Sequence, residues 1–155
     1  MEIRRAEHRD IGRINALLEQ VLRVHHDIRP DLFRESGKKY TDGELLSLME
    51  DENTPIFVAV EDGVVQGYAF CAMLCQKDHN ILTDVKTLYL DDLCVDEAVR
   101  GGGIGRALYA FVREYARQQG CYNVTLNVWE GNERAMHFYR SLGLSPQKTY
   151  MEERL

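Results

Sequence analysis

The sequence predicts a mixed-sheet α/β domain, and three observations support this fold class. Apolar residues recur at the spacing of an amphipathic helix in four segments of the chain. Other segments are β-branched apolar runs, or alternate between apolar and polar residues as half-buried strands do. The two kinds of segment follow one another without an internal repeat or a Pro/Gly/Ser-rich linker. We therefore expect residues 1–155 to form a single domain.

The N-terminal part is expected to contain one short strand and two helices. Residues 3–5 can form a strand, and residues 11–22 place apolar side chains along one helix face. A second helix is expected to start at Thr41, because Thr41 and Glu44 have the spacing of a capping box. Residues 31–40 between the helices are polar, and their number suits a surface loop.

Three strands are expected in the middle of the chain. Residues 56–60 and 64–75 are apolar runs joined across Asp62-Gly63, a pair typical of tight hairpin turns. A third strand, over residues 87–95, follows a polar loop. These segments predict a meander of neighbouring strands.

The C-terminal part is expected to alternate between helix and strand. Residues 104–120 have helical apolar spacing, and residues 122–128 alternate with a period of two. Asn132 is a suitable N-cap for a last helix, which Gly143 closes. A final strand is expected over residues 147–154.

Charge and hydropathy limit the class of protein. The chain has 19 Lys and Arg residues against 25 Asp and Glu residues, a net charge of −6. This balance disfavours a nucleic-acid-binding protein and slightly favours cationic small-molecule partners. The N-terminus lacks a signal-peptide pattern, and no apolar stretch approaches the length of a membrane span. We expect a cytoplasmic protein without membrane association.

Cysteine and histidine positions give no sign of a metal site. The four cysteines include no Cys-x-x-Cys pair and are expected to be reduced core thiols. His25 and His26 are adjacent on a predicted helix, so their side chains point about 100° apart and are poorly placed to share an ion. We expect no metal.

A glycine-rich loop lies directly between the predicted strand at 87–95 and the next helix. Its residues are Arg100, Gly101, Gly102, Gly103, Ile104, Gly105 and Arg106. Glycines let the backbone approach a ligand closely, and free N–H groups at a helix start suit a phosphate or pyrophosphate. The spacing excludes a dinucleotide fingerprint, and Arg106-Ala107 excludes a P-loop, which needs Lys-Ser/Thr there. A solvated turn is the alternative.

Three segments resemble the GNAT acetyltransferase superfamily. Arg100-x-x-Gly103-x-Gly105 is similar to the family signature Arg/Gln-x-x-Gly-x-Gly/Ala, whose loop holds the coenzyme A pyrophosphate. Residues 88–95 resemble the central strand, particularly that of the polyamine (spermidine/spermine) acetyltransferases. Residues 132–143 resemble the family segment Asn-x-x-Ala-x-x-Phe-Tyr-x-x-x-Gly. Only one strand is expected after the last helix, where many relatives have two.

The resemblance implies the acyl-CoA N-acyltransferase fold, with a mostly antiparallel central sheet, and acetyl-CoA as co-substrate. It implies that Arg100 and residues 101–106 bind the coenzyme. It further implies an amine acceptor, and homodimers are a family expectation. The function expected is direct acetyl transfer to a small-molecule or polyamine-like amine in a ternary complex. Alternatives are a protein or peptide N-acetyltransferase and a non-catalytic acyl-CoA-binding module.

Acetyl transfer to an amine requires removal of a proton from the ammonium group. Asp91 and Asp92 are the candidate bases, and in an ideal strand they point to opposite faces, so that only one of them faces a given cleft. Relatives in the family have a bulge near this point, and such a bulge here would change which aspartate that is. The resemblance to the polyamine branch favours Asp91. The alternative for each aspartate is a solvated strand end or an ion-pair partner.

The resemblance also assigns the other catalytic and coenzyme contacts. Backbone groups of Leu93, Cys94 and Val95 would pair with the pantetheine arm and polarise the acetyl carbonyl. Cys94 lacks a neighbouring base, so we do not expect it to be a nucleophile. Tyr139 would protonate the leaving thiolate, although its apolar neighbours also suit a core tyrosine. Asn132 would lie near the coenzyme in addition to capping its helix.

Overall fold

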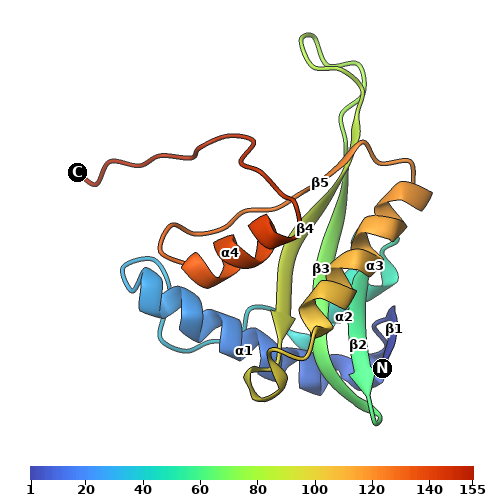
Figure 1. Ribbon diagram of the computed structural model, residues 1–155, viewed down its shortest axis with the longest axis vertical. Helices are drawn as coiled ribbons and strands as arrows, with labels where there is room; N and C mark the ends of the chain where they lie inside the picture. The colour runs from blue at the N-terminus through green and yellow to red at the C-terminus, as the bar shows by residue number, and fades with distance from the viewer.

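A five-stranded sheet forms the centre of the structure (Figure 1). The computed structural model describes residues 1–155. Strand order follows chain order, and every neighbouring pair is antiparallel except β4 and β5, which are parallel. The strands are β1 (Glu2–Arg5), β2 (Ile56–Glu61), β3 (Val64–Cys75), β4 (Lys86–Val95) and β5 (Asn123–Thr125). The mixed, mostly antiparallel sheet that the sequence predicts is confirmed.

Helices cover both faces of the sheet. They are α1 (Ile11–Ile28), α2 (Asp42–Glu50), α3 (Ile104–Gln118) and α4 (Glu133–Ser141), with short 3-10 turns η1 (His8–Asp10) and η2 (Glu97–Val99). In Figure 1, α3 crosses the face of the sheet opposite α1 and α2, and α4 lies beside β4. No helix is both long and apolar enough to cross a membrane.

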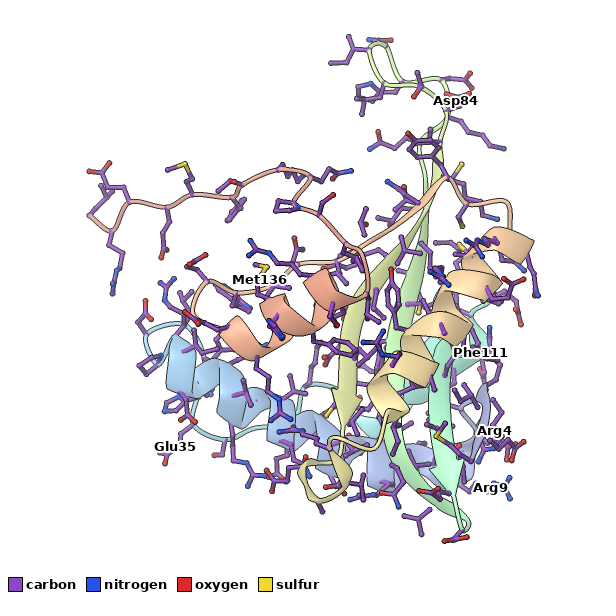
Figure 2. The ribbon with its side chains drawn as sticks, in the orientation of Figure 1. Arg4, Arg9, Glu35, Asp84, Phe111 and Met136 are labelled. Atoms are coloured by element: carbon purple, nitrogen blue, oxygen red, sulfur yellow. The ribbon has the colours of Figure 1, made fainter.

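Two apolar cores result from the alternation of side chains along the strands. Val58 of β2 packs with Leu17 of α1 in one core, and the adjacent Phe57 packs with Leu108 of α3 in the other. Phe57 also meets the ring of Phe111, labelled on α3 in Figure 2, at a centroid distance of 5.0 Å. Each side of the sheet is therefore anchored to its own helix layer.

Local sequence signals account for several element boundaries. Thr41 and Glu44 form the expected capping box, with reciprocal bonds of 3.1 and 2.7 Å to each other's backbone N–H groups. Asp62 and Gly63 connect β2 and β3 with φ values of 50° and 76°, as expected for a type I′ hairpin turn. The first helix ends at Ile28, next to Arg29-Pro30, which is where the helical pattern of the sequence stops.

The predicted final strand is wrong. Residues 147–154 form no strand and extend away from the sheet (Figure 1), with Tyr150 97% exposed. Their ion pairs are Glu152 with Arg29 and Arg154 with Asp31. The adjacent prediction at 122–128 is also too long, because only Asn123–Thr125 pairs with β4. A strand forms only where its backbone can hydrogen-bond to a neighbouring strand. At this edge of the sheet the neighbour would be β5, which is only three residues long.

Candidate active site

The centre of the candidate site is an open edge of β4. The parallel partner β5 is in register with β4 only from Thr87 to Tyr89, after which the two segments separate. The side chain of Asn127 donates a 3.0 Å hydrogen bond to the Tyr89 hydroxyl just beyond this point. The remaining half of β4, from Leu90 to Val95, has no strand on that edge and can pair with an extended ligand.

Backbone alternation identifies the groups that face the open edge. The N–H of Asp96 donates to the carbonyl of Gln66 at the end of the β3–β4 pair. In an antiparallel pair of strands, residues whose backbone N–H and C=O groups bond to the partner strand alternate with residues whose N–H and C=O groups point away from it. The register therefore directs the N–H and C=O groups of Leu93 and Val95 to the open edge, and those of Cys94 toward β3.

A bulge at Asp91 changes the faces of β4. Leu90 and Asp92 pair with consecutive residues of β3, so Asp91 is the extra residue between them. Leu90 packs in the core on the α3 side and Cys94 in the core on the α1 side, although an unbroken strand would place both on one face. The bulge thus turns Asp92 and Cys94 toward α1.

Asp92 is the buried carboxylate of the site. Its side chain is 11% exposed, and its Oδ2 accepts a 2.9 Å hydrogen bond from the hydroxyl of Tyr68 on β3. Burial raises the pKa of Asp92 to about 6, although Lys39 and the Tyr68 hydrogen bond act in the opposite direction. Asp92 therefore changes charge close to neutral pH.

Asp91 is the more accessible carboxylate. Its side chain is 37% exposed, and its Oδ2 lies 3.2 Å from the Nζ of Lys39. The same ammonium is 4.0 Å from Asp92 Oδ2. Burial would lower the pKa of Lys39, but Asp92 and Asp91 outweigh it and raise the pKa. The two aspartates thus form a site that holds a primary ammonium group.

Tyr139 lies on α4 and faces the α3-side core. Its ring packs against Tyr109 and Phe138 at centroid distances of 6.4 and 5.1 Å. Burial, with a further contribution from Asp92, raises the pKa of Tyr139 well above its usual value. Its hydroxyl makes no hydrogen bond within the chain. It does not belong to the buried polar atoms without a partner, because it keeps some exposure to solvent. This phenol keeps its proton at neutral pH and is free to donate it.

The glycine loop leads into the N-terminus of α3. Gly103 is the N-cap residue of α3, with a φ of 84°, and no side chain caps this helix. The first intrahelical bond is from Ala107 N–H to the Gly103 carbonyl, so the N–H groups of the preceding turn remain available. Free N–H groups and the positive helix end suit an anion such as a pyrophosphate.

Two further contacts connect this loop to the open edge. Arg100 Nε donates a 2.9 Å bond to the carbonyl of Val95, the last residue of β4. A Cβ at Gly105 would lie 3.2 Å from the ring of Phe138 and 3.5 Å from Val95. Gly105 therefore allows α4 to pack closely against the start of α3. Asn132 caps α4 as expected, with its Oδ1 3.2 Å from the N–H of Ala135.

The predicted residues thus come together from β4, the glycine loop and α4. Sequence reasoning missed Tyr68 and Lys39. Tyr68 is a hydroxyl-bearing residue inside an apolar strand, which is a detectable signal. Lys39 lies in the polar segment 31–40, where nothing distinguishes it from Lys38. No group of three or more His, Cys, Asp or Glu side chains is arranged to hold a metal ion.

Comparison with known proteins identifies the family. Residues 8–144 match the Acetyltransferase (GNAT) family. The chain belongs to this GNAT family. The match includes β4, the glycine loop and α4, and thus the whole candidate site.

Solved structures share the fold of this chain. A tetramutant of the BH1408 protein from Bacillus halodurans superposes on this GNAT chain with a TM-score of 0.95 and 32% identity, covering 100% of both chains. The aminoglycoside N-acetyltransferase AAC(6')-Iy, in complex with CoA, has a TM-score of 0.75 and 16% identity, covering 99% of this chain and 98% of its own. The second likeness is one of fold.

Curated GNAT relatives differ in the amine that their names specify. The thialysine N-epsilon-acetyltransferase of Bos taurus is 40% identical over 58 residues, 37% of this chain and 34% of that protein. The peptidyl-lysine N-acetyltransferase YjaB of Salmonella typhimurium is 28% identical over 145 residues, 92% of this chain and 82% of that protein. Among the first curated relatives, matches span only 41%, 34% and 52% of their length.

Proposed function

We propose that this protein transfers the acetyl group of acetyl-CoA to an amine by direct attack in a ternary complex. The observation that carries the proposal is the position of the Asp91–Asp92 pair on β4. The pair lies just beyond the point where β4 stops pairing with β5. The N-terminus of α3, which would bind an anion, follows β4 in the chain. An ammonium site and a coenzyme site then share one strand. Family membership supports the same activity.

The residues present suit coenzyme A. The free N–H groups of the 101–106 loop, with Arg100 and Arg106, would bind the pyrophosphate. The backbone groups of Leu93 and Val95 at the open edge would pair with the amide-containing pantetheine arm, and an N–H there would polarise the thioester carbonyl. Acetyl-CoA supplies the activated acyl group, and the chain supplies its orientation.

We assign the contact with the attacking amine to Asp91. The Lys39 ammonium, which represents an acceptor ammonium in this structure, is closer to Asp91 than to Asp92, at 3.2 against 4.0 Å. Asp91 is also more exposed, whereas Asp92 Oδ2 is occupied by Tyr68. In this proposal Asp91 removes the proton, and Asp92 adds the buried negative charge that attracts the cation.

Tyr139 would protonate the departing thiolate. A phenol with a raised pKa retains its proton until a stronger base forms beside it, and a thiolate leaving group meets that requirement. Cys94 is excluded from a covalent role, because burial raises the pKa of its thiol to about 12. Both features favour a direct transfer over a covalent acyl-enzyme route.

The acceptor we propose is a small-molecule primary alkylamine with cationic character. The carboxylate pair and the net charge of −6 favour a cation. The relatives named for thialysine and for peptidyl-lysine act on amines of this chemical type. Peptide lysine is the second candidate, since the YjaB match covers 92% of this chain.

The proposal can be tested by release of free CoA thiol from acetyl-CoA, with acetylated product identified by mass. The acceptors should include spermidine, a thialysine-type amino acid and a lysine peptide at equal concentrations. Amine-dependent release that is lost in Tyr139→Phe would support an acetyltransferase. Coenzyme binding without turnover on any amine would favour the non-catalytic acyl-CoA-binding module. Preference for the peptide would move the acceptor to protein lysines.

A further inference from the structure

One lysine of the chain occupies the proposed acceptor position. Lys39 Nζ is a primary alkyl ammonium, and it contacts both aspartates of the site. The other four lysines lie elsewhere: Lys38 pairs with Asp42, Lys86 donates to the carbonyl of Gln119, and Lys77 and Lys148 are exposed. Only Lys39 therefore resembles a bound substrate.

Aromatic contacts hold Lys39 in this place. Its Nζ lies 5.3 Å from the centroid of the Tyr40 ring, within the range of a cation–π contact. Tyr40 in turn stacks on Phe70 of β3 at 5.8 Å, with the two ring planes 16° apart. Phe70 is the residue that pairs with Asp92. The Lys39 side chain is thus fixed to the same part of the sheet as the carboxylates, while 44% of it remains exposed.

We propose that this protein acetylates its own Lys39 when no external amine competes. The inference rests on the proposed function, because it uses the same site and the same acetyl-CoA. Lys39 would act as an internal acceptor, with the 29–41 connection between α1 and α2 delivering the amine. It is a modification site formed by the fold rather than by a recognised sequence.

The transfer balances without a further reactant. Asp91 takes a proton from Lys39 Nζ, and the freed lone pair forms the C–N bond with the acetyl carbonyl carbon. The C–S bond breaks, its electron pair stays on sulfur, and Tyr139 protonates that thiolate. The nitrogen still bears two hydrogens when the C–N bond forms, and it loses the second proton to solvent as the amide is completed. Solvent returns a proton to Tyr139, and Asp91 releases to solvent the proton that it took, so one proton is released overall. The products are Nε-acetyl-Lys39 and free CoA.

Uncatalysed acetylation would give a different pattern. A lysine acts as a nucleophile only when neutral, and the aspartates raise the pKa of Lys39. Lys39 should therefore be less reactive than Lys77 or Lys148 in simple chemical acetylation. Selective modification at Lys39 consequently requires catalysis by the site.

The test uses the full chain and isotope-labelled acetyl-CoA in the absence of any amine acceptor. Intact mass and peptide mapping should show one label per chain, at Lys39 and not at the adjacent Lys38. The rate constant should not depend on protein concentration, since the reaction is intramolecular. Tyr139→Phe should slow the labelling at least tenfold. Lys39→Arg, which keeps the positive charge, should remove the label, whereas Lys38→Arg should leave it unchanged.

The outcomes distinguish self-acetylation of Lys39 from the acetyltransferase activity on which it depends. Calorimetric binding of acetyl-CoA and turnover of an external amine are measured on the same preparation. Turnover without label at Lys39, or label spread over Lys38, Lys77 and Lys148 and insensitive to Tyr139→Phe, would overturn self-acetylation and leave the acetyltransferase proposal standing. Failure of the folded protein to bind acetyl-CoA would overturn both.

Discussion

Tyr68 donates a 2.9 Å hydrogen bond from its hydroxyl to Asp92 Oδ2, across two neighbouring strands of the sheet. Tyr68 is fully buried, and it pairs with Cys94 rather than with Asp92 itself, so the contact is diagonal. The bond fixes the Asp92 side chain on the α1 side of β4. It leaves the accessible Asp91 as the carboxylate that an incoming amine meets first.

The buried carboxylate should make stability depend on pH. The pKa of Asp92 is raised from 3.8 to about 6 in the folded state. Between these values the folded chain holds a proton that the unfolded chain has lost, so the contribution of Asp92 to the free energy of unfolding falls as pH rises. Asp92→Asn should remove this loss and stabilise the protein at pH 8 by on the order of 3 kcal/mol. Urea denaturation of both proteins at pH 4.5 and pH 8 measures the difference.

The matched control for this experiment is Asp91→Asn. The Asp91 side chain is 37% exposed and pairs at the surface with Lys39, so its replacement should change stability by less than about 1 kcal/mol. The contradicting outcome is an equal pH dependence in the two proteins. If the free energy of unfolding changes between pH 4.5 and pH 8 by the same amount in the wild type and in Asp92→Asn, Asp92 is not desolvated.

The two aspartates should differ in catalysis. Asp91→Asn removes the proposed base, so kcat/KM for a cationic amine should fall by about 10²- to 10⁴-fold. Asp92→Asn keeps a hydrogen-bond acceptor for Tyr68 and should act mainly on KM. Asp42→Asn, which changes a surface carboxylate that contacts Lys38 and Asn15, should leave the rate unchanged. Steady-state kinetics with one acceptor tests this order, and the reverse ranking would move the base to Asp92.

Tyr139 should act on the chemical step and little on coenzyme binding. Tyr139→Phe keeps the ring that packs against Tyr109 and Phe138, and removes the proton donor. We expect kcat to fall by about 10²- to 10⁴-fold with a nearly unchanged Kd for acetyl-CoA. Tyr109→Phe is the control on the adjacent helix and should retain activity. If kcat falls only slightly and equally in both variants, Tyr139 is a core residue and not the proton donor.

Two glycines of the loop should respond differently to alanine. At Gly105 the added Cβ meets the Phe138 ring at 3.2 Å, closer than an ordinary contact, and Val95 at 3.5 Å, so the Phe138 ring on α4 must shift slightly. Gly105→Ala should cost about 1–3 kcal/mol of stability and weaken acetyl-CoA binding. At Gly102 the nearest atom is the Val99 carbonyl oxygen at 3.5 Å, an ordinary contact. Gly102→Ala should therefore be about as stable as the wild type. Thermal unfolding measures the Tm of each variant, and equal Tm values for Gly105→Ala and Gly102→Ala would contradict the packing argument.

Local signals in the sequence were sufficient to predict much of the fold. The capping box at Thr41, the Asp62-Gly63 turn and the glycine loop each depend on residues close together in the chain, and all three lie where expected. The strand predicted at 147–154 failed because a period of two indicates an extended chain and not the presence of a partner strand.

The site was predictable in its composition and not in its arrangement. The resemblance of residues 88–95 to the family's central strand, with the need for a base, drew attention to Asp91 and Asp92. The faces that they occupy depend on a bulge set by pairing with β3. Lys39 enters the site through the fold of the 29–41 connection, 52 residues away from Asp91 in sequence. Such long-range contacts leave no periodic pattern in a single sequence.

The central claim is that the loop before α3 and the open edge of β4 bind acetyl-CoA. Calorimetric titration of the purified protein with acetyl-CoA, with ATP and NAD as comparators, tests it most directly. We predict saturable binding of acetyl-CoA in the micromolar range, no comparable binding of ATP or NAD, and weaker acetyl-CoA binding by Gly105→Ala. A folded protein that binds no acetyl-CoA, or binds all three ligands equally, would contradict the account.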